Sequence, residues 1–263
     1  MRPLLTPAEI EAKAEEAGEA KASLPALRLL VLAILAGAFI AFGGSFMLLV
    51  RSDASLGFAA SQLLGGLVFT LGLFLVLVAG AELFTGNCLM VAGALSGRYA
   101  WTSVLRNWVI VYVGNAIGAV CIAVMFWAAG IFASNHGAVG EIALSVALTK
   151  AGLAPGVAFV RGILCNVLVC LAVWTGFAGQ SVCDKLAAAI LPVVAFVVLG
   201  FEHSIANLFF LPLGLFAQYA GVAGAGALTL TGAGSNLLFV TAGNIVGGAL
   251  VGAAYWFAYK RQR

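Results

Sequence analysis

The sequence predicts an all-helical membrane protein. Six transmembrane helices are expected to form two inverted three-helix repeats, with the second and fifth helices broken. The prediction depends on an extreme apolar composition, long charge-poor runs and a polar motif that occurs twice. Of the 263 residues, 63% are hydrophobic and 9% are charged, whereas soluble domains have about 25% charged residues. This composition excludes an ordinary soluble domain, and the 33 glycines are typical of helices that pack closely in lipid.

Six charge-poor segments are long enough to cross the hydrocarbon core, for which about 20 residues suffice. Four of them are expected to be single helices, at 29–50, 107–133, 156–177 and 235–259. The other two are too long for one straight crossing and contain glycine and polar residues. One covers 54–81 and 83–97, with a predicted break near Thr85–Asn87. The other covers 186–217, with a predicted break at Gly200–Asn207.

The N-terminal segment differs from these runs. Residues 8–22 are rich in alanine, glutamate and lysine, with opposite charges three or four positions apart. Thr6 followed by Pro7 is typical of a helix N-cap and first helical position. We expect a surface helix within 1–26, a six-span transmembrane domain at 27–260 and a basic tail at 261–263. No signal peptide is expected, so the first span itself should direct insertion.

A polar motif occurs twice along the chain, once in each half. Glu82-Leu-Phe-Thr-Gly-Asn87 and Glu202-His-Ser-Ile-Ala-Asn207 both place a glutamate at the first position and an asparagine at the sixth. A second pattern, which begins at Asn107 and again at Asn236, places Gly-Asn at the eighth and ninth positions. Three spans in each half require that the halves are inverted, so the broken helices should meet near the midplane. Such a repeat predicts a transport site at its interface.

Positive charge predicts the orientation of the chain. Six spans leave both termini on one side, and two cations, Arg51 and Lys150, are expected on the other side, with Arg161 inside the fourth span. The remaining ten of the 13 lysines and arginines lie on the side of the termini: Arg2, Lys13, Lys21, Arg28, Arg98, Arg106, Lys185, Lys260, Arg261 and Arg263. By the positive-inside rule, both termini are expected in the cytoplasm.

Ionisable groups in apolar segments are candidates for function, because each costs about 2.5–3.5 kcal/mol at mid-bilayer when unpaired. Glu82 and Glu202 are interpreted first as clamps that accept hydrogen bonds from backbone N–H groups freed by the breaks. Direct substrate contact is the alternative. His203 corresponds to Leu83 in the first repeat. A titratable side chain that breaks the symmetry indicates a pore-facing role, with a buried structural histidine as the alternative.

Neutral polar groups and loop cations complete the candidates. Thr85 offers a hydroxyl in the opposing break. Lys150, before the fourth span, is either a solvated loop residue or a cation that attracts anions to the outer mouth. Arg161 is expected to extend its guanidinium outward or to pair with a neighbouring subunit. Interhelical hydrogen bonding is the alternative or default interpretation for the asparagines: Asn87, Asn107, Asn115, Asn166, Asn207, Asn236 and Asn244.

No catalytic or metal centre is predicted. The five cysteines are odd in number, lack metal-ligand spacing and are interpreted as small buried residues. Phosphate-binding and dinucleotide motifs are missing from the sequence. The net charge of +3 is assigned to topology, not to nucleic-acid binding. We therefore expect neither an enzyme nor a cofactor. A proton relay through Glu82, Glu202 and His203 in an enzyme or carrier, and a pore for neutral solutes, are the competing classes.

These motifs resemble the formate/nitrite transporter family. The resemblance covers about residues 8–260 and is closest to bacterial formate channels. It is carried by Leu83-Phe-Thr-Gly-Asn87, Gly97-Arg98, Asn107-Trp108, Gly114-Asn115 and above all Gly200-Phe-Glu-His-Ser-Ile-Ala-Asn207. It implies an aquaporin-like fold and a homopentamer in the lipid of the bacterial inner membrane, with one pore per subunit. It also implies passage of small monovalent anions of weak acids, first of all formate. Alternatives are a nitrite or hydrosulfide channel and a proton-coupled symporter of the same fold; acetate and lactate are further family substrates.

The resemblance also implies roles by position, with His203 as a central pore histidine that exchanges protons. The implied residues of the substrate pathway are His203, Thr85, Asn166, Asn207, Asn244, Glu202 and Lys150. The implied apolar constrictions on either side of the histidine are Phe69, Leu73, Leu83, Phe84 and Phe196. Two such constrictions around a polar centre would exclude hydrated ions, so a weak acid would cross most easily as its neutral species.

Overall fold

The computed structural model describes residues 4–260, and these residues form helices and connecting segments without a strand. Within this range, five helical segments are long and apolar enough to cross a membrane. They are α2 (Ala26–Arg51), α3 (Phe58–Leu75) with the π turn η1 (Val76–Gly80), α6 (Trp101–Ala128), α8 (Pro155–Ala178), and α11 (Leu230–Tyr255) with the π turn η5 (Trp256–Lys260). The predicted all-helical class is confirmed. The predicted tail at 261–263 lies outside the described residues.

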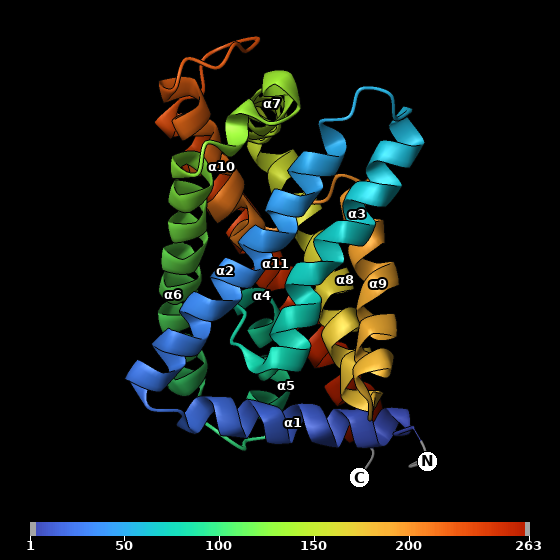
Figure 1. Cartoon of the computed structure of the whole chain (residues 1–263). Helices are drawn as coiled ribbons and strands as arrows, with labels where there is room; N and C mark the ends of the chain where they lie inside the picture. The colour runs from blue at the N-terminus through green and yellow to red at the C-terminus, as the bar shows by residue number, and fades with distance from the viewer. Residues whose placement is uncertain (1–3, 261–263) are drawn as a thin grey trace.

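The other helical elements are shorter. They are α1 (Pro7–Ser23), α4 (Phe84–Asn87), η2 (Cys88–Met90), α5 (Val91–Leu95), η3 (Ile131–Ala133), η4 (Asn135–Gly137), α7 (Ala138–Ala151), α9 (Val182–Val198) and α10 (Ser204–Tyr219). α1 lies across one end of the bundle, where it contacts η5, and α7 lies at the opposite end (Figure 1). Between these ends, α2 packs against α6 and α3, while α8 packs against α11 and α9. The two groups are joined where α3 packs against α9.

Glycines allow the closest helix pairs to form. A Cβ atom at Gly118 of α6 would overlap the carbonyl oxygen of Ile34 on α2. A Cβ atom at Gly247 of α11 would overlap the carbonyl oxygen of Ile163 on α8 in the same way. Close backbone approach at small residues is how helices associate in lipid. Apolar side chains are already out of water there, so the hydrophobic effect does not drive one helix against another. The second pair follows the first by the same offset in sequence that separates the two Gly-Asn patterns, so the repeat is also present in the packing.

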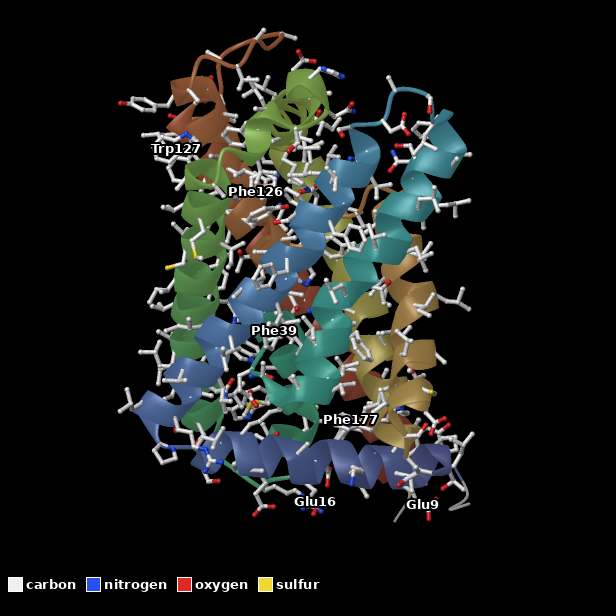
Figure 2. The ribbon with its side chains drawn as sticks, in the orientation of Figure 1. Glu9, Glu16, Phe39, Phe126, Trp127 and Phe177 are labelled. Atoms are coloured by element: carbon white, nitrogen blue, oxygen red, sulfur yellow. The ribbon has the colours of Figure 1, made fainter. Side chains whose placement is uncertain are left out.

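The N-terminal segment forms the helix α1 in the structure. Thr6 is its N-cap and forms a capping box with Glu9, and Pro7 is the first helical residue. On the side that faces the bundle, the buried carboxylate of Glu15 pairs with Arg98 at 2.7 Å and also accepts from the Ser96 hydroxyl. On the opposite side, Glu9 and Glu16 project away from the bundle (Figure 2). α1 is therefore a surface helix that is tied to the segment after α5.

Both predicted breaks exist, but the first lies earlier than expected and the second, which includes Gly200 as expected, ends earlier. The first follows η1 at Gly80, whose φ of +83° ends the helix, and α4 begins at Phe84. The second follows α9 at Gly200, whose φ is +66°, and α10 begins at Ser204. Glycine adopts this left-handed conformation at little cost. The first break therefore lies just before Thr85–Asn87, because these residues already form the next helix.

Other boundaries also differ from the sequence predictions. α6 begins at Trp101, not at 107, and ends at Ala128, because Gly130 turns the chain with a φ of +71°. α11 begins at Leu230, five residues before the start expected at 235. α7 was not predicted at all: it has 14 residues and carries Glu141 and Lys150, so a search for spans passes over it. Lys150 therefore belongs to the last turn of a helix and not to a loop.

Candidate functional site

The polar centre of the bundle is a contact between the two interrupted helices. Thr85, in the first turn of α4, lies 3.0 Å from His203 through its Oγ1 and the ring Nε2. Both side chains are buried. His203 is the N-cap of α10, and its Nδ1 accepts a hydrogen bond from the backbone N–H of Ala206 at 3.1 Å. A neutral ring that keeps both bonds carries its hydrogen on Nε2 and donates it to Thr85.

An asparagine of α6 satisfies the backbone at the first break. The Oδ1 of Asn115 accepts from the N–H of Phe84 at 2.9 Å. Its Nδ2 donates to the carbonyl oxygens of Ala33 at 2.7 Å and Glu82 at 2.9 Å. This fully buried amide therefore joins α2, the break and the start of α4.

The corresponding asparagine of the second repeat has the same function at the second break. The Oδ1 of Asn244, on α11, accepts from the N–H of Ser204 at 2.8 Å. Its Nδ2 donates to the carbonyl oxygens of Gly162 at 2.8 Å and Glu202 at 3.0 Å. Asn166 adds a bridge between the halves, because its Nδ2 donates to the carbonyls of Thr85 at 3.1 Å and Asn244 at 2.6 Å.

These bonds correct the interpretation of the two glutamates. Asn115 and Asn244, not Glu82 and Glu202, hold the backbone N–H groups that the breaks release. An amide has both a donor and an acceptor, whereas an ionised carboxylate only accepts. A break exposes carbonyls as well as N–H groups, so only the amide can satisfy both.

The glutamates instead hold lysines. The carboxylate of Glu82 accepts from Lys21 Nζ at 2.8 and 2.9 Å and from Asn87 Nδ2 at 2.7 Å. Asn87 also donates to Asn107 Oδ1 at 2.9 Å. Lys21 comes from α1 and was not singled out by the sequence analysis. One signal could have found it, because Lys21 precedes Lys150 by the same offset that separates Asn107 from Asn236.

The second glutamate has the corresponding partners. Glu202 accepts from Lys150 Nζ at 3.0 Å, from Asn207 Nδ2 at 2.7 Å and from Asn236 Nδ2 at 3.3 Å. Asn207 also donates to Asn236 Oδ1 at 2.7 Å, and Asn236 donates to the carbonyl of Lys150 at 2.9 Å. Each break therefore carries one charge-paired network, and the two networks lie on opposite sides of the Thr85–His203 contact.

Two cavities flank this contact. The first, which we call the α1-side cavity, has a volume of about 360 Å³ and is lined by Lys21, Glu82 and Leu83, among others. The second, the α7-side cavity, has about 230 Å³ and is lined by Lys150 and His203, among others. Each cavity is lined by residues of one break, Glu82 and Leu83 in the first and Glu202 and His203 in the second.

The five residues expected at the constrictions are all buried, but they occupy different places. Phe69 and Phe196 line the α7-side cavity with their rings in edge contact at 5.8 Å, and Phe196 stacks on His203 at 5.9 Å. Leu83 lines the α1-side cavity. Phe84 packs against Tyr112 at 5.0 Å and lines neither cavity. Leu73 also lines neither cavity.

Two further ionisable residues lie in different places. His136 lies apart from the site in η4, while Arg161 lines the α7-side cavity.

Comparisons with known proteins agree with this architecture. The family model described as Formate/nitrite transporter matches residues 8–257. Formate channel FocA of Escherichia coli (strain K12) is 40% identical, over 98% of this chain and 96% of that protein. A solved structure titled FNT family ion channel matches with a TM-score of 0.85 at 30% identity, covering 95% of this chain and 98% of the other.

A second solved structure, titled Pentameric formate channel with formate bound, matches with a TM-score of 0.79 at 35% identity. It covers 89% of this chain and 98% of the other. The match of the family model includes both interrupted helices and both charge-paired networks. The resemblance noted from the motifs is thus confirmed. This multi-pass membrane protein belongs to the formate/nitrite transporter family.

Proposed function

We propose that this protein is a channel for small monovalent anions of weak acids, with formate as its main substrate. The single observation that carries the proposal is the Thr85–His203 contact, which joins two interrupted helices between two cavities. The names of its relatives agree with formate as substrate. These relatives are named as channels, which supports a channel and not an enzyme.

The proposal includes an architecture. Six spans are arranged as two inverted three-helix repeats, with α3 and α9 as the first parts of the interrupted spans. The support is the recurrence of each hydrogen-bond network in the second half of the chain, as for Asn115 and Asn244. The chain assembles as a homopentamer in the lipid of the bacterial inner membrane, as the pentameric relative suggests. The termini and α1 face the cytoplasm, so α7 lies on the outer side.

In the proposed mechanism the anion enters a cavity and crosses the centre as the neutral acid. Lys150 on one side and Lys21 on the other attract the anion, although each is already paired with a glutamate. Beyond the lysine of the α7-side cavity, the rings of Phe69 and Phe196 offer no hydrogen bonds. Desolvation of a charge there costs far more than desolvation of a neutral acid. Discrimination against inorganic ions follows from this difference.

His203 exchanges the proton at the centre: the charged imidazolium gives one proton to the anion and returns to the neutral ring, which then takes up a proton from water. In the neutral ring the free electron pair is on Nδ1, where it accepts from Ala206. Uptake of a second proton at Nδ1 therefore displaces this cap, and the start of α10 must loosen when the ring becomes charged. Proton transfer is thus coupled to a small local opening of the helix beside Thr85.

The test is a flux panel in proteoliposomes. Formate, nitrite, hydrosulfide, acetate and lactate are compared at two pH values, for the parent protein and His203→Asn. We expect formate to be carried fastest, and we expect the variant to fold but to lose the pH dependence of flux. Identical pH profiles in the two proteins would remove the proton-exchange role. A higher rate for nitrite or hydrosulfide would change the substrate, and a fixed proton-to-formate ratio against a gradient would indicate symport.

A further inference from the structure

The two cavities differ in charge. The α7-side cavity is lined by three cationic side chains, Arg51, Lys150 and Arg161, and by one carboxylate, Glu202. The α1-side cavity is lined by one cation, Lys21, and one carboxylate. Lys150 is neutralised by Glu202 at 3.0 Å. Across residues 4–260, neither Arg51 nor Arg161 forms an ion pair within 4.0 Å of a carboxylate. The α7-side cavity therefore has an excess of two positive charges.

Both arginines are held in place by close packing. The Cγ and Cδ atoms of Arg51 lie 3.3 Å from the position that a Cβ atom would occupy at Gly65, so its stem packs directly on α3. Gln62, one turn earlier on α3, lines the same cavity and has a buried Oε1 that accepts no hydrogen bond within the described part of the chain. Arg161 comes from α8, and its Nη1 lies 3.9 Å from the corresponding Cβ position at Gly200. The guanidinium of Arg161 thus lies beside the second break.

The repeat offers an internal comparison for Arg161. By the offset that relates Asn244 to Asn115, Arg161 corresponds to Leu32, which lines the α1-side cavity. Their backbone carbonyls accept corresponding hydrogen bonds. The carbonyl of Leu32 accepts from the N–H of Glu82 at 3.2 Å, and the carbonyl of Arg161 accepts from the N–H of Glu202 at 3.3 Å. A leucine therefore meets the structural needs of this position. The guanidinium is an addition on one side only, as His203 is in place of Leu83.

We propose that Arg51 and Arg161 form a binding site for a small carboxylate in the α7-side cavity, which captures formate before it reaches Lys150. The substrate class rests on the proposed function. A guanidinium presents two parallel N–H donors that match the two oxygens of a carboxylate. Gln62 adds an amide that donates or accepts. The cavity of about 230 Å³ has room for several waters at about 30 Å³ each, and thus for a hydrated formate ion.

An excess of positive charge on one side makes the channel asymmetric. A cleft lined by one sign of charge concentrates its counter-ion by about 10-fold to 1,000-fold. Formate uptake from the α7 side therefore saturates at a lower concentration than uptake from the α1 side. The maximal rate from the α7 side is lower in the same proportion, because a passive channel carries equal one-way fluxes in both directions when the two concentrations are equal and low.

The test measures formate flux against concentration in right-side-out and inverted membrane vesicles. The variant is Arg161→Leu, which installs the residue of the other repeat, and Arg28→Leu, an exposed arginine at the start of α2, is the charge-matched control. We expect Arg161→Leu to raise the half-saturation concentration from the α7 side by about tenfold, at the low end of electrostatic focusing. Its maximal rate from the α7 side should rise in the same proportion, while its flux at low formate concentration and its α1-side kinetics should match the parent. Added salt should raise the α7-side half-saturation concentration of the parent toward that of the variant, because it screens the charges of the arginines.

Equal half-saturation concentrations in the variant and the parent would overturn the site. If Arg161→Leu does not assemble, Arg51→Gln replaces it with the same expectation. Calorimetric titration of formate into purified protein separates this site from the proposed function. Binding by the parent that is weakened in the variant supports the site even when no formate flux is found. If formate flux is found but neither arginine variant changes formate binding or the half-saturation concentration, the proposed function is supported and the proposed binding site is excluded.

Discussion

Asn244→Leu is expected to destabilise the protein strongly although leucine is close to asparagine in size. Asn244 is fully buried, and its side chain forms three hydrogen bonds, with Ser204 N, Glu202 O and Gly162 O. Gly162 lies inside α8, so its carbonyl keeps the bond of the helix. The N–H of Ser204 and the carbonyl of Glu202 lie at the break and lose a partner.

Each buried backbone group left without a partner costs about 1–3 kcal/mol. Two such groups give about 2–6 kcal/mol, a large part of the total stability of about 5–15 kcal/mol of a typical protein. At about 2–4 °C per kcal/mol for chains of roughly this size, the unfolding midpoint should fall by at least about 4 °C. Asn115→Leu should cause a similar loss, because Asn115 makes the same three bonds at the first break.

The assay is thermal unfolding of the purified oligomer, followed by size-exclusion chromatography and tryptophan fluorescence. Val246→Leu is the matched control, since it places a leucine on the same helix at a position that is 37% exposed. The control should unfold with the parent. If Asn244→Leu also unfolds with the parent, the asparagines are not what holds the broken helices, and the reasoning about the breaks is refuted.

Two further changes test the constriction and the helix packing. Phe196→Ala removes the ring that stacks on His203, so formate flux should rise, lactate should pass and discrimination against chloride should weaken; unchanged flux ratios would make Phe196 a packing residue only. Gly118→Ala places a methyl group against the Ile34 carbonyl, so we expect loss of the oligomer on size-exclusion chromatography. Gly234→Ala meets nothing within 4 Å and should be tolerated; equal behaviour of the two glycine variants would contradict the close-packing argument.

The sequence predicted the helical class and the existence of both breaks, because composition and glycine placement are visible in it. It placed the first break too late and made the second too long, because glycine and polar residues mark the region without showing that Gly80 ends one helix and that Ser204 begins another. The prediction that Thr85 and His203 lie opposite each other came from the sequence repeat and from the family resemblance. Which side chain reaches a freed N–H depends on how α6 and α11 pack, so the amides could not be chosen over the glutamates beforehand.

The helix α7 and the role of Lys21 were missed for a related reason. A search for spans favours long apolar runs, and α1 and α7 are short helices that carry charge. Their equivalence becomes visible only when the lysines are counted within the repeat. Lys21 and Lys150 then occupy matching positions, each bound to the glutamate of its own break.

The meeting of the two interrupted helices at Thr85 and His203 has an electrical consequence. The apolar helical stretch Phe84–Leu95 and α10 both begin at this contact, so the N-terminal ends of both helices point toward it. Each helix carries a partial charge of about +0.5 at its N-terminus. The centre therefore favours negative charge through the direction of the backbone alone. Preference for anions over cations would survive any substitution of Thr85 or His203 that leaves the two helix starts intact.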